Sequence, residues 1–248
     1  MTSHPTSDPS AGNSHSRFAT TRWSIIAAAA ADDSAATDAL EQLCESYWYP
    51  LYAFIRRQGY AADDAQDLTQ GFFTRLIEKR DLSQIDPQRG RFRAFLIAAA
   101  KHFLMNEHDR RNALKRGGGW VRTSVEFAAA EDRLATYLAS HEKSPDEFFE
   151  RQWALTMIER TVDKLRSDYA DRGQSEQFEH LQPFLTDDPG SIREAAAAAE
   201  ITEAAFRVAL HRLRKRFGSA LRDEIRQTVT TDEEVDDELR SLFTALAR

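Results

Sequence analysis

The stretch that decides the fold runs from Asp63 to Arg116. It begins with DDAQDLTQGFFTRLIEK and, after the turn DPQRG, ends with RFRAFLIAAAKHFLMNEHDRRNALKR. In the first segment, Leu68, Phe72 and Leu76 recur at i, i+4 and i+8, which is the spacing of one helix face. Proline and glycine in the turn interrupt the helical pattern. The spacing therefore predicts two helices joined by a basic loop.

The second segment is apolar in its first half and basic in its second. Around its start, Arg89, Arg91 and Arg93 are interleaved with the rings of Phe92 and Phe95. This mixture suits single-stranded nucleic acid, because phosphates attract arginine and unstacked bases stack on aromatic rings. The same pattern also fits an ordinary core helix with a solvated basic end. The residues by themselves leave both interpretations open.

DDAQDLTQGFF followed by RFRAFLIAAAKHFLMNEHDRR resembles region two of bacterial RNA polymerase sigma factors of the extracytoplasmic-function (ECF) group. The resemblance implies that the first helix docks on the clamp helices of the polymerase β′ subunit. It also implies that the following loop and helix melt and read the minus-ten promoter element. The polymerase-facing residues implied in this way are Asp64, Asp67, Gln70 and Phe73. The implied promoter-facing residues are Arg91, Phe92, Arg93, Lys101, Asn106 and Arg110.

The resemblance continues upstream, where TRWSII and YWYPLYAFIRRQGY resemble the N-terminal half of region two. Helical spacing predicts two helices between Phe18 and Tyr60, the second running through Pro50. Two positions depart from the family pattern. The family often has Glu where this chain has Gln66, and commonly an acidic residue where it has Gly71. A glycine at this position weakens the helix by about 1 kcal/mol relative to Ala.

Capping residues predict where two later helices begin. Ser144, followed by a proline and by Glu147, has the pattern of a capping box with proline at the first helical position. Ser191 and Glu194 repeat the capping-box spacing. We therefore expect helices to start directly after Ser144 and Ser191.

Residues 191–217 have the form of a helix-turn-helix. A short alanine-rich helix leads to a turn at Glu200, and Thr202 caps the next helix. That helix has an inward apolar stripe and an opposite basic one, formed by Phe206, Leu210, Leu213 and Phe217 and by Arg207, His211 and Arg214. Docking in a DNA major groove requires such a pair of stripes. A solvated basic helix in a bundle is the alternative.

SIREAAAAAEITEAAFRVALHRLRKRF resembles sigma region four, which reads the minus-thirty-five element and contacts the polymerase β flap. The DNA contacts that follow from this resemblance are Thr202, Arg207, His211, Arg214 and Lys215. The family often has Gly in the turn, where this chain has Glu200. A non-glycine residue fits there if its φ stays negative.

Composition narrows the functional class. Hydrophobic residues make up 42% of the 248-residue chain, which allows a core, and widespread helical periodicity with few strand signals predicts an all-α fold. The net charge is −7, from 33 Lys and Arg against 40 Asp and Glu, which argues against a free-standing tight DNA binder. Basic residues are nevertheless concentrated at 89–116 and 207–216. A sigma factor fits this distribution, because its complex with the polymerase supplies part of the affinity for DNA.

The sequence predicts a cytoplasmic protein that acts without membrane, metal or cofactor. Its single cysteine, Cys44, allows no internal disulfide and suits a reducing compartment. Neither a signal peptide nor a membrane-spanning run is recognisable. The 7 histidines are scattered, and the acidic pairs lie at helix starts or turns. We therefore expect that the protein has no catalytic site and is not an enzyme.

The chain ends in an acidic amphipathic segment, 230–248. Thr231 can cap a helix whose first turn is acidic, and Val235, Leu239 and Leu242 then repeat at helical spacing. So short a helix is marginal alone in water, so it should dock on something. One alternative is structural docking on region two or four. The other is that its acid covers the basic stretch at 207–216 and holds the free protein closed.

The expected organisation has five parts. They are a disordered tail (1–17), a region-two-like domain (18–116), a linker (117–143), a region-four-like helix-turn-helix domain (144–229) and the acidic helix (230–248). The leading interpretation is a transcription initiation factor whose partners are core RNA polymerase and promoter DNA, with an anti-sigma factor as a further candidate partner. The alternatives are a free-standing helix-turn-helix regulator and an all-helical interaction scaffold.

Overall fold

The computed structural model describes residues 34–79, 92–113, 131, 134, 144–186, 190–229 and 231–247. All regular structure within these ranges is helical, which confirms the all-α class. The helices are α2 (Ser34–Arg57), α3 (Ala62–Lys79), α4 (Phe92–Ala113), α6 (Pro145–Ala170), α7 (Ser175–Leu181), α8 (Pro183–Thr186), α9 (Ile192–Ala198), α10 (Glu203–Arg226) and α11 (Asp232–Ala247). The expected N-terminal tail, the helix before Ser34 and the loop at 80–91 lie outside the described residues.

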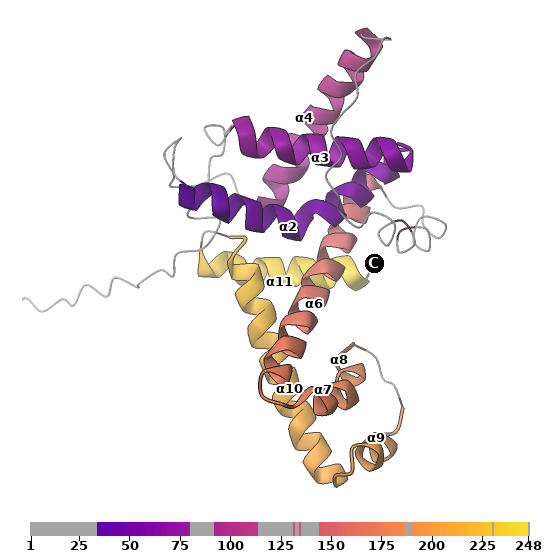
Figure 1. Ribbon diagram of the computed structural model, residues 1–248, viewed down its shortest axis with the longest axis vertical. Helices are drawn as coiled ribbons and strands as arrows, with labels where there is room; N and C mark the ends of the chain where they lie inside the picture. The colour runs from indigo at the N-terminus through magenta and orange to yellow at the C-terminus, as the bar shows by residue number, and fades with distance from the viewer. Residues whose placement is uncertain are drawn as a thin grey trace, which may run out of the picture.

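Two long helices connect the ends of the molecule (Figure 1). At one end, α3 and α4 lie over α2, while α11 runs beneath α2. From there α6 and α10 extend side by side to the other end, where α7, α8 and α9 gather around them. Helix α6 packs against α2, α10 and α11, so it joins the two ends of the chain.

The helix starts are those that the capping residues predict. Before α6, the Ser144 hydroxyl accepts from the Glu147 amide and the Glu147 carboxylate accepts from the Ser144 amide, which completes a capping box. Before α9, the Ser191 hydroxyl accepts from the Glu194 amide at 3.4 Å, which is half of the expected box. Thr202 caps α10 by accepting from the Ala205 amide at 3.2 Å.

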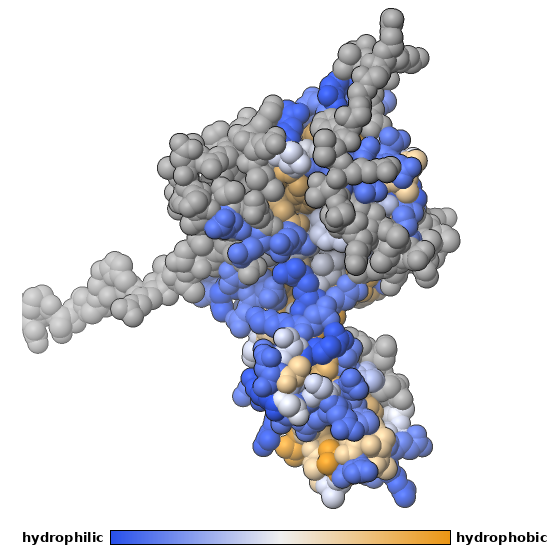
Figure 2. Space-filling model, in the orientation of Figure 1, coloured by the Kyte–Doolittle hydropathy of each residue, from blue (hydrophilic) through white to orange (hydrophobic). Residues whose placement is uncertain are grey.

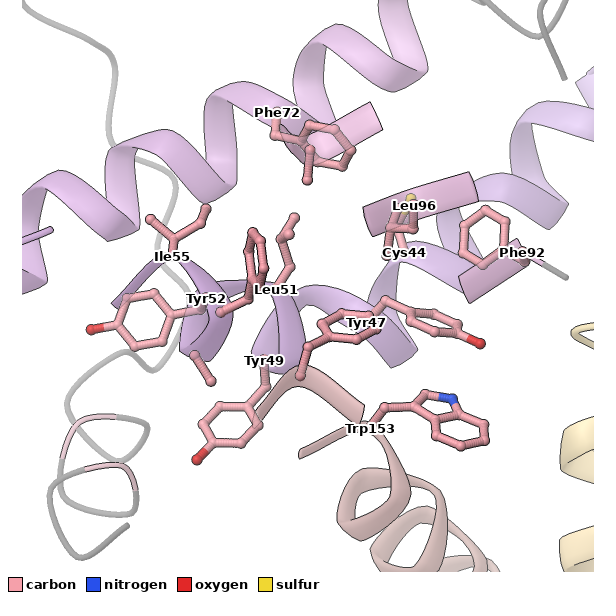
Figure 3. Close-up of a cluster of buried hydrophobic side chains, with 14 of the residues drawn as sticks. Cys44, Tyr47, Tyr49, Leu51, Tyr52, Ile55, Phe72, Phe92, Leu96 and Trp153 are labelled. Atoms are coloured by element: carbon pink, nitrogen blue, oxygen red, sulfur yellow. The ribbon is translucent and has the colours of Figure 1, made fainter. Parts of the chain in front are cut away.

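The larger core crosses the predicted division between the region-two-like and region-four-like parts. Tyr47 of α2, Phe92 of α4 and Trp153 of α6 are each fully buried, and Figure 3 shows their rings gathered between the three helices. Ile225 of α10 and Leu242 of α11 belong to the same buried cluster. Residues far apart in the sequence therefore bury apolar surface together.

A smaller core supports the helix-turn-helix. Its members come from the second half of α6 and from α7 to α10, among them Leu165, Phe178, Phe206, Leu210 and Leu213. The inward stripe predicted for the second helix is thus confirmed at its first three positions, and Phe217 is partly buried against both cores. This packing leaves the opposite side of α10 facing solvent.

Candidate polymerase and DNA surfaces

Helix α3 presents a polar face beside its buried stripe. Asp64, Asp67 and Gln70 are partly exposed there. Phe73 is 9% exposed, and its ring lies 5.3 Å from that of Phe72 in an edge-to-face contact. Three of the predicted polymerase-facing residues are therefore at the surface, while Phe73 belongs to the core that supports them.

The buried side of α3 is closely fitted. The Thr69 hydroxyl, 2% exposed, donates to the Ala65 carbonyl at 2.7 Å, so the buried polar group is satisfied within the helix. The Phe72 ring meets Phe103 of α4 at 5.7 Å. A Cβ added at Gly71 would lie 3.6 Å from the Phe103 ring, an ordinary van der Waals contact. The packing fixes the direction in which the polar face points.

The first turn of α4 is buried. Phe92 is 0% exposed, its ring lies 5.0 Å from that of Tyr47, and its amide donates to the Thr228 carbonyl at 3.4 Å. Truncating so buried a ring to Ala costs about 3–5 kcal/mol. Phe92 therefore cannot stack on a DNA base in this conformation, and a substitution there changes stability as well as any DNA contact. Arg91 lies outside the described residues.

Arg93 is buried in a cluster of charges from three helices. It is 6% exposed and pairs with Glu150 of α6 and with Glu238 of α11, the latter at 2.7 Å. Its guanidinium carbon lies 4.0 Å from the centre of the Trp153 ring, within the range of a cation–π contact. Sequence spacing gives no sign of this cluster, because Arg93 and Glu238 are 145 residues apart.

The outer part of α4 carries the remaining predicted promoter-facing residues. Lys101 is exposed and pairs with Asp146 in the first turn of α6 at 2.7 Å. Asn106 is exposed, and Arg110 is exposed while pairing with Glu107 of its own helix at 2.7 Å. The structure thus brings Phe92 and Arg93 into the core and leaves the other three described residues at the surface.

The turn of the helix-turn-helix is held in a left-handed conformation. Glu200 has φ +54°, the one non-glycine residue with positive φ in the described ranges. Its amide donates to the Ala197 carbonyl at 3.1 Å, and the Ile201 amide donates to the Ala196 carbonyl at 3.0 Å. This is the Schellman arrangement, in which Gly is the usual residue. The condition that a non-glycine residue fits this turn with a negative φ is therefore not met: Glu200 adopts positive φ, and in this conformation the carbonyls of Ala196 and Ala197 accept both hydrogen bonds.

The solvent side of α10 carries most of the predicted region-four contacts. Arg207, His211 and Lys215 are exposed at i, i+4 and i+8. Arg214 is exposed as well, and it donates to the Phe184 carbonyl of α8 at 3.0 Å, so its guanidinium also ties α8 to α10. The Thr202 hydroxyl is engaged as the helix cap. The exposed basic stripe is therefore formed by Arg207, His211, Arg214 and Lys215.

Two residues beside this stripe were missed by the sequence analysis. Val208 is 51% exposed, and Arg212 is exposed one turn further along α10. The inward stripe already implied their direction, since positions 207, 208, 211, 212 and 215 all lie away from it. Figure 2 shows apolar surface gathered near the end of the molecule formed by α9 and the start of α10, next to polar surface.

Residues of the predicted linker are anchored on α2. Leu134 is fully buried, and Glu131 accepts from the Tyr52 hydroxyl and from Arg56, the latter at 2.7 Å. The hydrogen bond from Arg56 lowers the pKa of the Glu131 carboxyl, despite partial burial. Burial and the neighbouring carboxylate raise the pKa of Tyr52 above its ordinary value. These groups form a partly buried ion pair that ties the chain between α4 and α6 to α2.

Neither a membrane helix nor a metal cluster is found in the described ranges. No helix there is long and apolar enough to cross a bilayer. No group of three or more His, Cys, Asp or Glu side chains there is arranged to hold a metal ion. The predicted site residues that the structure describes at the surface lie on the polar face of α3, the outer part of α4 and the basic face of α10.

Comparison with known protein families matches the chain to one family. A family model described as "ECF sigma factor" matches residues 25–223, which is most of the chain and includes α2, α3, α4, α6, α9 and most of α10. No curated protein and no solved structure matches the chain. The chain belongs to the ECF sigma factor family, whose members bind RNA polymerase and initiate transcription.

Proposed function

We propose that the protein directs core RNA polymerase to promoters by using its two ends for different tasks. The polar face of α3 binds the clamp helices of β′, and the region around α4 melts and reads the minus-ten element. The basic face of α10 reads the minus-thirty-five element as duplex, while the β flap receives this end of the protein. Membership of the family supports the general role, and the assignment of each surface is our proposal.

The observation that carries the proposal is the pair of outward polar faces at the two ends of the molecule that α6 and α10 connect. Asp67 and Gln70 face solvent on α3, and Arg207, His211 and Lys215 face solvent on α10. The first face is acidic and the second is basic, so they suit different partners. Phosphates attract the basic face, and exposed side chains on a helix that enters the major groove reach base edges.

The polymerase assignment is tested by reversing the charge of the α3 face. We expect Asp67→Arg combined with Gln70→Ala to abolish co-elution with core RNA polymerase and to leave helicity unchanged, because both side chains are partly exposed. Glu45→Arg, on an exposed position of α2, is the matched control and should co-elute normally. Normal co-elution of the α3 variant would refute the assignment.

A free-standing regulator is the alternative, and it makes an opposite prediction. Such a protein binds duplex DNA specifically without polymerase. The net charge of −7 opposes this, because specific DNA-binding domains that act alone are normally basic. Specific promoter binding by the isolated protein, unchanged by core polymerase, would favour the alternative.

A further inference from the structure

Helix α11 lies outside the part of the chain that matches the family, yet it touches the predicted promoter-melting element. The family match ends at residue 223, and α11 spans Asp232–Ala247. From this position Glu238 reaches Arg93 in the first turn of α4. The carbonyl of Thr228, in the short connection from α10 to α11, accepts from the Phe92 amide. The connection after α10 therefore contacts Phe92, and α11 contacts Arg93, the two buried residues at the start of α4.

The contact with Arg93 competes directly with DNA. A guanidinium that pairs with Glu150 and Glu238 and covers the Trp153 ring has no side open to a phosphate. Phe92, at 0% exposure, has no ring face open to a base. Melting and holding a strand with these two residues requires them to leave this environment. The described conformation is therefore closed with respect to the start of α4.

Glu238 is a charged residue at a buried position of α11, which is unusual for a helix with only a structural role. It is 0% exposed and lies three residues after buried Val235 and four before buried Leu242, within the apolar stripe of α11. Replacing a buried ion pair by well-packed apolar residues is often neutral or stabilising, so the pair is poorly explained by stability alone. A carboxylate at this position instead gives Arg93 a partner of the same charge as a DNA phosphate.

The rim of the α11 interface is also ionic. Asp236 pairs with Arg222 at 2.7 Å, and Asp232 pairs with Arg226 at 2.9 Å, both across the contact between α11 and α10. All four side chains are partly or largely exposed, so these pairs are weak and screened by salt. A helix of 16 residues has little stability of its own in water, so α11 depends on these contacts to stay folded.

We propose that α11 is a built-in clamp that keeps the free protein closed by occupying Arg93 with Glu238, and that binding of polymerase and DNA displaces it. This inference rests on the proposed role of the α4 start in promoter melting. The sequence analysis offered the alternative that the acidic helix covers residues 207–216. The clamp takes its place, because the acidic side chains of α11 pair with Arg93, Arg222 and Arg226. Arg207, His211 and Lys215 stay exposed, so the clamp acts on the start of α4 and not on the α10 face.

The direct test uses the full chain with Glu238→Gln, which keeps the shape of the side chain and removes its charge. Affinity for a fluorescein-labelled polydeoxythymidine strand is measured by anisotropy for the free protein and for its complex with core polymerase. We expect the free variant to bind about fivefold or more tightly than the wild type, the lower end of common coupling factors. The difference should shrink in the polymerase complex, where the clamp is already displaced.

A second pair of variants tests whether tighter strand binding comes from undocking of α11 or only from an added positive charge. Asp236→Lys repels Arg222 at the rim and should raise strand affinity of the free protein, and Arg222→Asp in the same chain should restore the wild-type value. Glu233→Lys is the matched control, because Glu233 is exposed on α11 and the charge change is the same. Equal gains from Asp236→Lys and Glu233→Lys would overturn the clamp.

The lone cysteine distinguishes opening from unfolding. Cys44 of α2 is 6% exposed and belongs to the larger buried cluster, part of which Figure 3 draws. In the clamp mechanism its thiol stays protected from Ellman's reagent in Glu238→Gln. Fast labelling without tighter strand binding, or protected Cys44 with unchanged strand binding, would each overturn the proposal. If wild-type protein fails to bind core polymerase, the proposed function fails, while the strand comparison still tests the clamp.

Discussion

At the scale of single residues, Glu200 is held in a conformation that its side chain disfavours. Its φ of +54° costs an L-residue with a Cβ about 1–2 kcal/mol relative to glycine. The turn persists because it satisfies the terminal carbonyls of α9 and positions α10 against it. The strain is therefore located next to the proposed DNA-reading helix.

We expect Glu200→Gly to raise the free energy of unfolding by about 1 kcal/mol, because glycine adopts positive φ without the Cβ clash. Denaturant unfolding followed by circular dichroism measures the change. Ala199→Gly is the control, since Ala199 has φ −82° and glycine brings no relief there. A loss of stability in Glu200→Gly would show that the side chain contributes more than the strain removes.

Gly71 offers the opposite case, a glycine that the backbone does not require. It lies inside α3, and an added methyl group would meet Phe103 at an ordinary contact distance of 3.6 Å. We expect Gly71→Ala to stabilise the protein by about 1 kcal/mol through helix propensity. Gly59→Ala should destabilise it, because Gly59 has φ +96°. Thermal unfolding of the two variants gives opposite shifts if this is correct.

At the scale of elements, the basic residues of α10 differ in their contacts with the rest of the protein. Arg207 and Arg214 are both exposed, and Arg214 in addition donates to the Phe184 carbonyl and helps to fix α8. The sequence analysis gave both residues the same DNA-reading role. The structure separates them because Arg214 contacts another helix, whereas Arg207 pairs with Glu203 of its own helix at 3.8 Å.

We expect Arg207→Ala to weaken binding of the polymerase complex to promoter duplex by about 1–3 kcal/mol, with unchanged stability. Arg214→Ala should also lower the free energy of unfolding by about 0.5–1.5 kcal/mol, because a hydrogen bond between elements is lost. Arg172→Ala, exposed in the turn after α6, removes the same charge and serves as the control. Equal DNA affinity of the Arg207 and Arg172 variants would remove α10 as the reading helix.

At the scale of the whole molecule, long-range ion pairs tie separate parts of the chain to α2 and α4. Besides the pairs of Arg93, Arg56 of α2 holds Glu131 from the segment between α4 and α6. Because the Glu131 carboxyl has a lowered pKa in the folded protein, the charged form stabilises the fold. That contribution is fully present above the ordinary pKa of Glu and is lost as pH falls through the lowered value.

We therefore expect Glu131→Gln to reduce stability at neutral pH and to match the wild type in acid, where the wild-type carboxyl is itself protonated. Urea unfolding at a series of pH values measures the difference. Glu179→Gln, exposed on α7, should show no such pH-dependent difference. A constant difference across the series would mean that the Glu131 charge does not matter.

The sequence by itself determined the local structure and the family. Apolar spacing predicted the buried stripes of α3 and α10, and capping residues predicted the starts of α6, α10 and α11, where Thr231 and Glu234 exchange hydrogen bonds. The family followed from the order of two motifs, and the match to residues 25–223 confirms it. These features depend on contacts within a few residues, which a single sequence displays directly.

Only the tertiary structure decided where the helices meet. The spacing around Phe92 and Arg93 fitted a DNA-binding loop as well as a core helix, and packing against α2, α6 and α11 placed both side chains inside. The partner of Arg93 lies 145 residues away, so no local pattern reveals it. Which helix faces come together depends on the total apolar surface that the whole chain buries. No single segment of the sequence reveals that total.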